Sequence, residues 1–433
     1  MLGKTGYDIR RHGDEHTSPS TRSLPSVHNR PMTYDAAVVG AGPAGSHVAA
    51  LMAAQGLRVI VLEQSGELGK KACCTGIVSN ECLRAFPQLG PAVRQDLSAA
   101  RIFSPSGSSV RVSRSEPQAH ALDRAALDKL LAERARANGA EYALESTVES
   151  VSASPTEARL EVRCNGTGTR ALHAQVVVLA CGFSPSLTAR AGLGAIPDFA
   201  IGAQARVELK DLTEAELYLG RNVAPGFFAW AVPTSGGEGL VGLLSRRGAR
   251  PRLEMLLSRL HKAGKLSAPA GPVLEAPVPL RPLRRSYGPR LLVVGDAAGH
   301  VKPTSGGGIY YSLLGAEFAA QTIVRAAGQG DFSRRGLSTY EKLWKKRLAR
   351  EFRVGHWARR IFERLSDPEI EEILDAVVAN GVHETVLRSE QYAFDWHARV
   401  ILDSLQHPVL GRLLGKAARA ALLAQARRLG TPG

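Results

Sequence analysis

The sequence predicts an α/β fold that combines a parallel-sheet domain, a lobe built on an antiparallel sheet and a C-terminal helical region. Three observations lead to this prediction. Apolar runs suited to buried parallel strands precede glycine-rich turns at residues 35–40 and 291–295. Short strand patterns with turn signals lie between them, and the chain ends in basic helical segments. At 433 residues, the chain is longer than one hydrophobic core usually organises.

Composition narrows the class of protein. The chain is 44% hydrophobic and 22% charged, as ordinary globular proteins are, and its net charge of +15 favours an anionic partner. The five cysteines are odd in number and lack a C-x-x-C pair, so we expect no metal site, no disulfide scaffold and a reducing compartment. No nucleic-acid recognition motif is present, so we expect no nucleic-acid partner. No apolar run suits a signal peptide or a membrane span.

The first glycine-rich turn has the spacing G-x-G-x-x-G between a strand and a helix. Gly40 permits the tight turn, Gly42 lets a pyrophosphate approach the backbone, and Gly45 lets the helix pack closely on the strand. Ala44 lies in the same turn, where helix N–H groups face the phosphates. The spacing therefore predicts a dinucleotide site, with a purely structural glycine turn as the alternative.

An acidic residue ends the second strand of this unit. The run 58–63 is apolar up to Glu63, about 20 residues beyond the turn. A carboxylate there accepts hydrogen bonds from both ribose hydroxyls and repels a 2′-phosphate, which favours FAD or NAD over NADP.

A second segment, residues 291–311, indicates a long ligand. Its strand ends in Gly295 and Asp296, and the carboxylate can hold a polyol hydroxyl. Three glycines then open a helix, and their N–H groups can stabilise negative charge at a ring edge. The three glycines are Gly306, Gly307 and Gly308, and Ile309 follows them.

Together these residues resemble the FAD-dependent geranylgeranyl reductase family, among flavoproteins with a p-hydroxybenzoate-hydroxylase-like fold. The resemblance covers roughly residues 34–341 and includes a D-R-x-x-L-D segment at 123–128. It implies that Arg124 contacts the FAD, that Asp296 contacts the ribityl chain, and that residues 306–309 lie at the isoalloxazine edge.

Two further segments resemble the family's substrate cavity. The stretch 225–233 is similar to an aromatic Y-x-W-x-F-P motif, and it places Phe228 and Trp230 on one strand face before Pro233. Residues 71–77, K-A-C-C-T-G-I, are similar to K-P-C-G-G-G-I, in which the cysteine, here Cys73, lies near the flavin. Taken alone, the aromatic stripe is more often core, and the cysteine can equally be an inert buried thiol.

The predicted organisation is discontinuous. Residues 1–33 are expected to form a disordered tail, and residues 329–433 a basic helical region. The FAD-binding domain, of Rossmann type, takes residues 34–95, 122–193 and 281–328. The substrate-binding sheet lobe takes residues 96–121 and 194–280, including a hairpin around Ser106 and Gly107.

The function that we expect is reduction of isolated double bonds in a prenyl lipid, with hydride from reduced flavin. Cys73 or Tyr310 would donate the proton. One dinucleotide motif implies that NAD(P)H binds transiently or that another donor reduces the flavin. The alternatives are a monooxygenase or halogenase of a lipophilic natural product and a non-redox flavin-containing cyclase. The sequence leaves the oligomeric state open.

The basic segment 341–364 carries nine basic residues against three acidic ones. It is either an ordinary solvated helical face or a surface that docks on anionic lipid. We therefore expect a cytoplasmic protein, with peripheral binding at the inner face of the membrane as the open alternative.

Overall fold

The computed structural model describes residues 33–70, 73–166, 168–388 and 394–415. Three predicted parts lie outside the described residues. They are the tail, of which only Thr33 is described; Lys71 and Ala72 of the cysteine motif; and the end of the basic helical region.

The first sheet is built around parallel strands in the order β17-β18-β11-β1-β2-β8, and β9 and β10 extend β11 as an antiparallel ribbon. Only β17 joins the main path in antiparallel orientation. The strands are β1 (Thr33–Val39), β2 (Val59–Leu62), β8 (Glu141–Ala143), β9 (Ser146–Ala153), β10 (Ala158–Cys164), β11 (Gly168–Leu179), β17 (Tyr287–Gly288) and β18 (Leu291–Val293).

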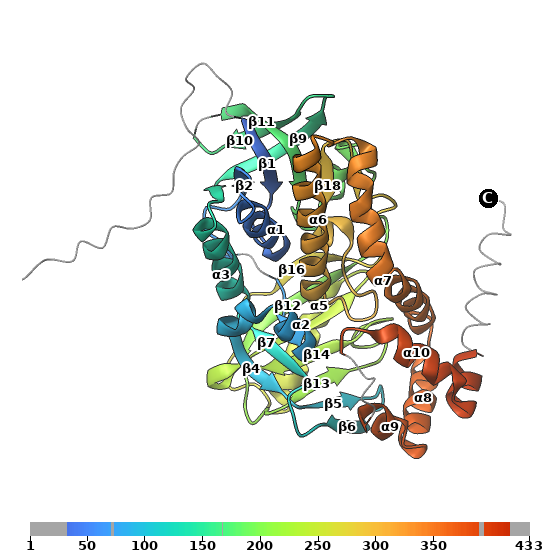
Figure 1. Ribbon diagram of the computed structural model, residues 1–433. Coiled ribbons are helices and arrows are strands. Elements are labelled where there is room, and N and C mark those ends of the chain that lie inside the picture. The colour runs from blue at the N-terminus through green and yellow to red at the C-terminus, as the bar shows by residue number, and fades with distance from the viewer. Residues whose placement is uncertain (1–32, 71–72, 167, 389–393, 416–433) are drawn as a thin grey trace, which may run out of the picture.

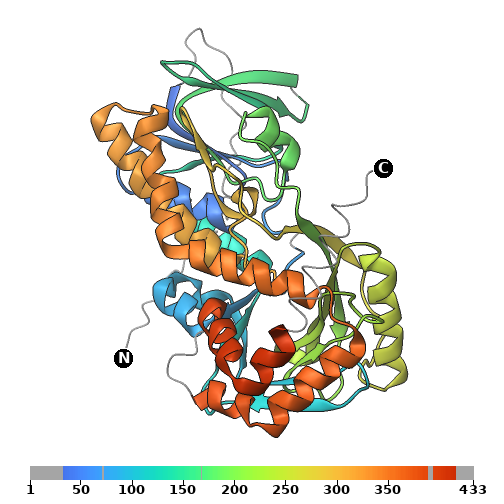
Figure 2. The ribbon, with the colours of Figure 1, turned by 90° about the vertical axis from the view of Figure 1, so that its right-hand side faces the viewer.

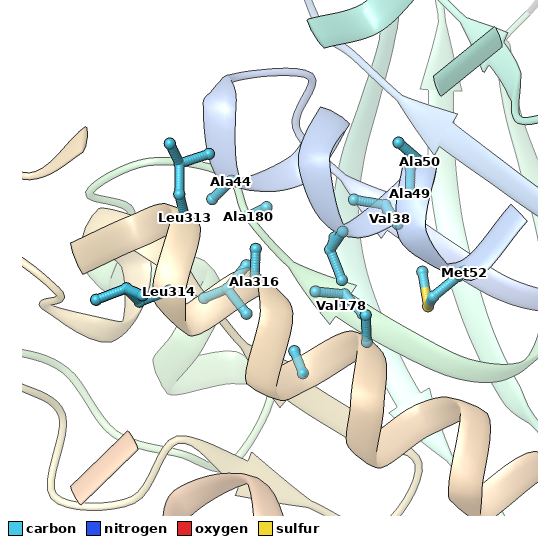
Figure 3. Packing of buried hydrophobic residues seen from close by; sticks show 14 of the residues in the cluster. Val38, Ala44, Ala49, Ala50, Met52, Val178, Ala180, Leu313, Leu314 and Ala316 are labelled. Carbon is cyan, nitrogen blue, oxygen red and sulfur yellow. The ribbon is translucent and has the colours of Figure 1, made fainter. Parts of the chain in front are cut away.

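Helices α1 (Pro43–Ala53), α3 (Arg124–Ala137) and α6 (Ile309–Gln329) cover one face of this sheet (Figure 1). Alternate strand residues divide between the two faces: Val38 and Val61 pack against the helices, whereas Ile60 packs with the β9–β10 ribbon. Small side chains such as Ala49 and Ala316 let α1 and α6 approach closely (Figure 3). The predicted buried parallel strands and the following helix are therefore confirmed.

The second sheet has seven strands in the order β16-β12-β15-β14-β13-β5-β6, and α5 (Ala249–Lys262) packs on β12 and β15. The hairpin predicted around Ser106 and Gly107 is confirmed as β5 and β6. The β5–β13 pair is parallel, because two separate chain segments supply these strands. The strands are β5 (Ala99–Phe103), β6 (Ser109–Ser113), β12 (Phe199–Glu208), β13 (Ala215–Tyr218), β14 (Ala229–Pro233), β15 (Glu238–Ser245) and β16 (Leu274–Pro279).

A small three-stranded sheet connects these two parts. It pairs β3 (Ile77–Ser79) and β4 (Val93–Leu97) with β7 (Ala119–Leu122), and α2 (Asn80–Ala85) and the 3₁₀ turn η1 (Pro87–Ala92) join β3 to β4. It takes residues from both sides of the boundary that the sequence predicts at residue 95.

The C-terminal region is helical where the structure describes it. Its elements are α7 (Arg334–Phe362), α8 (Asp367–Ala379), α9 (Val382–Arg388) and α10 (His397–Gln406). The remaining short elements are α4 (Pro185–Arg190), η2 (Ser235–Gly237) and η3 (Gly295–Ala298). Among the described residues, no helix is both long enough and apolar enough to cross a bilayer.

Helix α7 ties the two large sheets together, since it contacts β17 and β18 at one end and the seven-stranded lobe at the other (Figure 2). Its buried side chains recur at three- and four-residue spacing. They include Leu337, Tyr340, Trp344, Leu348 and Phe352. The Trp344 indole N–H donates to Ser286 Oγ at 2.9 Å, and the Tyr340 hydroxyl donates to the Val293 carbonyl at 2.6 Å.

Trp344→Ala should lower the free energy of unfolding by about 3–5 kcal/mol, because it empties a core site and leaves the Ser286 hydroxyl without its donor. Trp357→Ala on the same helix is the matched control, since Trp357 is 41% exposed and Trp344 only 2%. We expect a change within about 0.5 kcal/mol for the control. Urea unfolding followed by circular dichroism measures both, and equal losses would contradict this account of α7.

Candidate functional site

The glycine-rich turn between β1 and α1 has three distinct backbone requirements. Gly40 has φ +103°, and a Cβ there would lie 2.4 Å from the carbonyl oxygen of Ala180. A Cβ at Gly45 would lie 1.9 Å from the Gly40 carbonyl oxygen, so only glycine lets α1 start this close to the strand. A Cβ at Gly42 would meet nothing within 4 Å. The backbone at Gly42 therefore borders open space, as a phosphate cradle requires.

This turn borders a groove of about 650 Å³, a volume typical of cofactor sites. Of the residues predicted to bind the cofactor, ten line it: Gly40, Gly42, Ala44, Glu63, Arg124, Gly295, Asp296, Gly306, Gly308 and Ile309. Gly45 lies beneath the turn as a packing residue, and Gly307 lines a neighbouring cavity instead. The two predicted halves of the site, far apart in sequence, thus share one groove.

The polar ends of the groove suit a dinucleotide. The Glu63 carboxylate accepts hydrogen bonds from the backbone N–H groups of Ala41 at 2.9 Å and Ser65 at 2.8 Å, which fixes it beside the turn. Arg124 pairs with Asp128, at 3.2 Å between Nη2 and Oδ1. Its buried Nε and Nη1 have no hydrogen-bond partner. Because buried donors are rarely left unpaired, these N–H groups are available to an acceptor in the groove.

Asp296 lies at the C-terminal end of β18, partly buried against the glycine loop. Burial raises the pKa of its carboxyl to about 6, and the positive charge of Arg124 opposes the rise. A Cβ at Gly308 would lie 2.9 Å from Asp296 Oδ1, so a larger residue there would displace the carboxylate. This residue set fits FAD, with hydroxyl acceptors at Glu63 and Asp296 and free donors at Arg124.

A second cavity of about 400 Å³ lies between the seven-stranded sheet and the glycine loop. Phe228, Trp230 and Val232 line it from one face, as their period-two spacing predicts, and the rings of Phe228 and Trp230 are 5.8 Å apart. The Trp230 indole fits against Gly242, where a Cβ would lie 2.5 Å from the ring. Pro233, also predicted here, is the last residue of β14; it is buried and is not among the residues that line the cavity.

The two cavities meet. Six residues line both of them: Cys73, Cys74, Val278, Gly306, Gly308 and Ile309. A ring bound in the groove against the glycine loop would therefore face the apolar cavity directly, with the cysteine pair beside the junction.

The predicted proton donors are placed differently. Cys73 lies at the junction, and burial raises the pKa of its thiol to about 11, so it stays protonated at neutral pH. Neither Cys73 nor Cys74 is in a disulfide. Tyr310 is not among the residues that line either cavity, and its hydroxyl donates to Glu81 Oε1 at 2.9 Å. Its ring packs against Phe86 and Trp396, so the structure does not support it as a donor to a ligand in the cavity.

Sequence reasoning missed a buried ion pair at the cavity wall. Lys302 lines the apolar cavity, and its Nζ lies 2.6 Å from Asp395 Oδ1, with 6% and 1% of the two side chains exposed. The Asp395 carboxylate also accepts a hydrogen bond from the Ser79 hydroxyl. His397 lines the same cavity, and burial lowers its pKa to about 4. Lys302 and Asp395 are 93 positions apart in the chain, and no sequence motif links them.

Comparisons with known proteins agree with this geometry. The family described as lycopene cyclase protein matches residues 35–242. A digeranylgeranylglycerophospholipid reductase of Methanocaldococcus jannaschii is 32% identical over 361 residues, which cover 79% of this chain and 90% of that protein. Digeranylgeranylglycerophospholipid reductase 2 of Methanothermobacter thermautotrophicus is 30% identical, and the alignment covers 79% of this chain and 91% of that protein.

Among solved structures, a geranylgeranyl bacteriochlorophyll reductase-like protein of Thermoplasma acidophilum aligns with a TM-score of 0.76 at 24% identity, covering 89% of this chain and 99% of that one. A mutant of the halogenase PltM in complex with FAD aligns with a TM-score of 0.64 at 16% identity, covering 92% and 93%. The fold and groove thus define the class of FAD-dependent flavoproteins, as the sequence predicts. Within this class, the chain belongs to the digeranylgeranylglycerophospholipid reductase family.

Gly42→Val should weaken FAD binding by about 3 kcal/mol, or about a hundredfold in Kd, because its side chain would fill the space open to the pyrophosphate. Gly42 has φ −69°, so valine causes no backbone strain in the turn. The FAD content of the purified protein, read from its visible absorbance, measures the effect.

Gly90→Val is the control, since a Cβ at Gly90 also meets nothing within 4 Å but lies outside the groove. Equal FAD content in the two folded variants would contradict the cradle.

Proposed function

We propose that the protein is a FAD-dependent reductase of isolated carbon–carbon double bonds in a prenyl lipid. The observation that carries this proposal is the junction of the dinucleotide groove with the apolar cavity at the glycine loop and Cys73. The names of its relatives support the substrate class.

FAD, once reduced, supplies the hydride that an isolated alkene accepts at one carbon. The side chains and backbone of the protein bind the cofactor and position the alkene. The first turn of α1 and Arg124 hold the anionic part of the cofactor, and Glu63 and Asp296 hold its hydroxyls. The backbone N–H of Gly308 would stabilise negative charge at the ring edge, whereas the Gly306 N–H donates to the Lys302 carbonyl at 2.9 Å. The lining of Phe228, Trp230 and neighbouring aliphatic residues excludes water and aligns the alkene with the ring.

The second alkene carbon needs a proton, and we assign its donation to Cys73. Its thiol lies at the junction and carries its proton at neutral pH. Lys302 also lines the apolar cavity, and its ion pair with Asp395 holds it in place. Reprotonation of Cys73 from solvent would complete the cycle.

Reduction of the flavin requires a donor. The described residues hold a single G-x-G-x-x-G turn at a strand end, and FAD occupies it in this proposal. NAD(P)H would then bind transiently, or another reductant would deliver the electrons.

Two other flavin functions remain to be tested against this one. One is a monooxygenase or halogenase. The halogenase PltM shares the fold, but W-x-W-x-I-P of halogenases is matched here without its first tryptophan. The other is a non-redox cyclase, which the match to the lycopene cyclase family supports. Mass spectrometry of a prenyl-lipid panel incubated with reduced enzyme separates the three. Products heavier by two hydrogens per bond, without O₂ uptake, support the reductase; oxygenated, halogenated or isomeric products contradict it.

Cys73→Ser and Trp230→Ala should each lower turnover at least about tenfold, with FAD content unchanged, because both residues line the apolar cavity. Product formation per bound FAD measures the effect. Met255→Ala, at a side chain that is 64% exposed on α5, is the control and should keep full activity. Full activity in both cavity variants would rule out the cavity assignment.

Peripheral membrane binding is the corresponding proposal for the delivery of the substrate. The basic residues of α7 do not form one free face: Arg359 is buried over the Phe227 ring, Arg347 lies over Trp396, and Lys345 pairs with Glu341. The other basic residues of α7 that are exposed include Lys342, Lys346, Arg350 and Arg353. Each basic residue near an anionic surface contributes about 1 kcal/mol.

Replacing Lys342, Lys346, Arg350 and Arg353 together with Gln should reduce cosedimentation with anionic liposomes, while FAD content stays constant. High salt should have the same effect on the unmodified protein, since the Debye length is about 8 Å at physiological salt. Equal binding to neutral and anionic liposomes would contradict electrostatic docking.

A further inference from the structure

A third cavity, of about 680 Å³, lies where the end of α7 meets the seven-stranded sheet. It shares no lining residue with the groove or the apolar cavity. Two carboxylates and one histidine contribute to its wall, at Asp198, Glu363 and His356. Seven arginines line it: Arg221, Arg246, Arg247, Arg252, Arg281, Arg360 and Arg364. Its lining therefore carries a large excess of positive charge.

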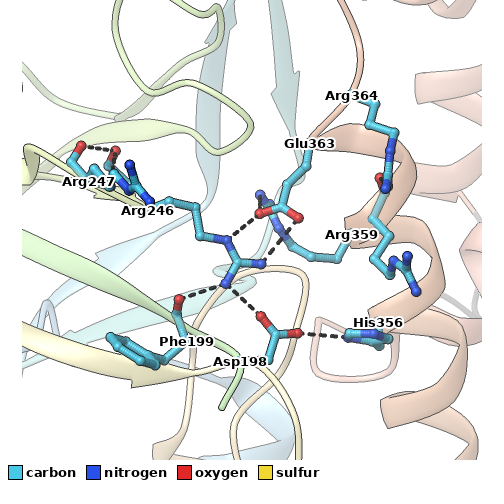
Figure 4. A network of polar contacts seen from close by, with 10 residues as sticks. Asp198, Phe199, Arg246, Arg247, His356, Arg359, Glu363 and Arg364 are labelled. Carbon is cyan, nitrogen blue, oxygen red and sulfur yellow. Dashed lines mark hydrogen bonds and ion pairs between the residues drawn. The ribbon is translucent and has the colours of Figure 1, made fainter. Parts of the chain in front are cut away.

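Both carboxylates are already committed to one arginine (Figure 4). Arg246 donates to Asp198 Oδ1 at 2.6 Å and to the Phe199 carbonyl oxygen at 2.7 Å. It also donates to both oxygens of Glu363, at 2.7 and 3.2 Å. Glu363 faces a further cation, since Arg359 Nη2 lies 3.8 Å from its Oε1. These two carboxylates thus have little capacity to neutralise the other arginines.

Three of the other six arginines, Arg221, Arg252 and Arg364, donate to carbonyl oxygens. Arg221 Nη1 donates to the Leu365 carbonyl at 3.2 Å, and Arg364 Nη1 donates to the Arg360 carbonyl at 2.8 Å. Arg247 and Arg281 are exposed, and within the described residues no carboxylate lies in ion-pair range of either. Carbonyl contacts fix the direction of a guanidinium group without removing its charge. Arg247 and Arg281 therefore bring positive charge to the cavity that no carboxylate of the described residues pairs with.

The positive charge of the cavity affects His356 in its lining, and Arg359 packs behind that lining. His356 Nδ1 lies 3.7 Å from Asp198 Oδ2, yet its pKa is lowered, by burial first and then by the positive charges of Arg281 and Arg360. Arg359 supports the wall from behind, with its guanidinium 3.5 Å from the centre of the buried Phe227 ring. Arg221, Arg246 and Arg364, which carbonyl or carboxylate groups hold, are therefore positioned before any ligand arrives.

We infer that this cavity, which we call the arginine pocket, binds a phosphate group that carries at least two negative charges. Guanidinium groups match phosphate oxygens through paired N–H bonds, and several of them around one cavity favour a polyanion over a single carboxylate. Several arginines are exposed, so the ligand enters from solvent or from a membrane surface. A soluble phosphate ester and a phospholipid headgroup present the same chemistry. The inference does not depend on the proposed reductase activity.

The test uses the FAD-loaded protein, so that the phosphate cradle at Gly42 is filled. Isothermal titration calorimetry with inorganic diphosphate measures binding to the unmodified protein, to Arg247→Gln/Arg281→Gln and to Arg334→Gln/Arg335→Gln. The last variant is the control, because it removes two exposed charges from the start of α7, outside the pocket. We expect saturable binding that weakens at least about tenfold in the pocket variant and less than about twofold in the control.

A competition arm identifies the source of the phosphate. Phosphatidylglycerol vesicles that displace diphosphate, when phosphatidylcholine vesicles do not, support a lipid headgroup; failure of both to displace it supports a soluble ester. Absence of saturable diphosphate binding would overturn the inference. Equal weakening in both variants would also overturn it, since the effect would then reflect net charge alone. FAD content, measured in parallel, verifies that each variant is folded and loaded.

Discussion

The site depends on a backbone contact that leaves no room for side chains. Where β1 ends, Gly40 touches the carbonyl group of Ala180 on the neighbouring strand end, and Gly45 touches Gly40 in turn. These contacts bring the start of α1 against the edge of the parallel sheet and aim its free N–H groups into the groove. A side chain at either position would push the helix away and widen the groove. Glu63, which accepts the Ala41 N–H at 2.9 Å, closes the same turn from the next strand.

A second glycine contact sets the relation between cofactor and substrate. A Cβ at Gly306 would lie 3.1 Å from Leu244 and 3.4 Å from Val278, both on the seven-stranded sheet. The loop after β18 therefore lies directly on the lobe, and the groove and the apolar cavity share their boundary there. Helix α7 holds this arrangement, because it packs on β17 and β18 and its Arg359 lies over Phe227 of the lobe. The arginine pocket lies at its far end and is a consequence of the same junction.

The sequence predicted those parts of the site that depend on local backbone geometry. Glycine spacing between a strand and a helix specifies a turn, and period-two spacing places Phe228 and Trp230 on one face, so both predictions needed no tertiary information. Tyr310 was predicted as one of two candidate proton donors, with Cys73 as the other. Helix periodicity instead turns its side chain to Glu81, and a resemblance between motifs does not carry that direction.

Contacts between distant segments could not be predicted in this way. The Lys302–Asp395 pair joins a loop to the start of α10, and neither residue has a sequence neighbour that identifies its partner. The arginine pocket draws on both sheet strands and helices, and a charge count along 341–364 could not separate its arginines from the exposed ones. Pro233 follows Val232 in β14, so alternation along the strand turns it away from the face that lines the cavity, and a motif match does not carry that direction.

The central claim is that a ring held against the glycine loop exchanges electrons with an alkene in the adjoining apolar cavity. Anaerobic stopped-flow absorbance tests it most directly, with the fully reduced holoenzyme mixed against a prenyl lipid in the absence of oxygen. The account predicts reoxidation of one FAD for each double bond lost, and a much slower reoxidation in Trp230→Ala at equal FAD content. Reduced FAD that persists with the lipid and is reoxidised only when oxygen is admitted would contradict it.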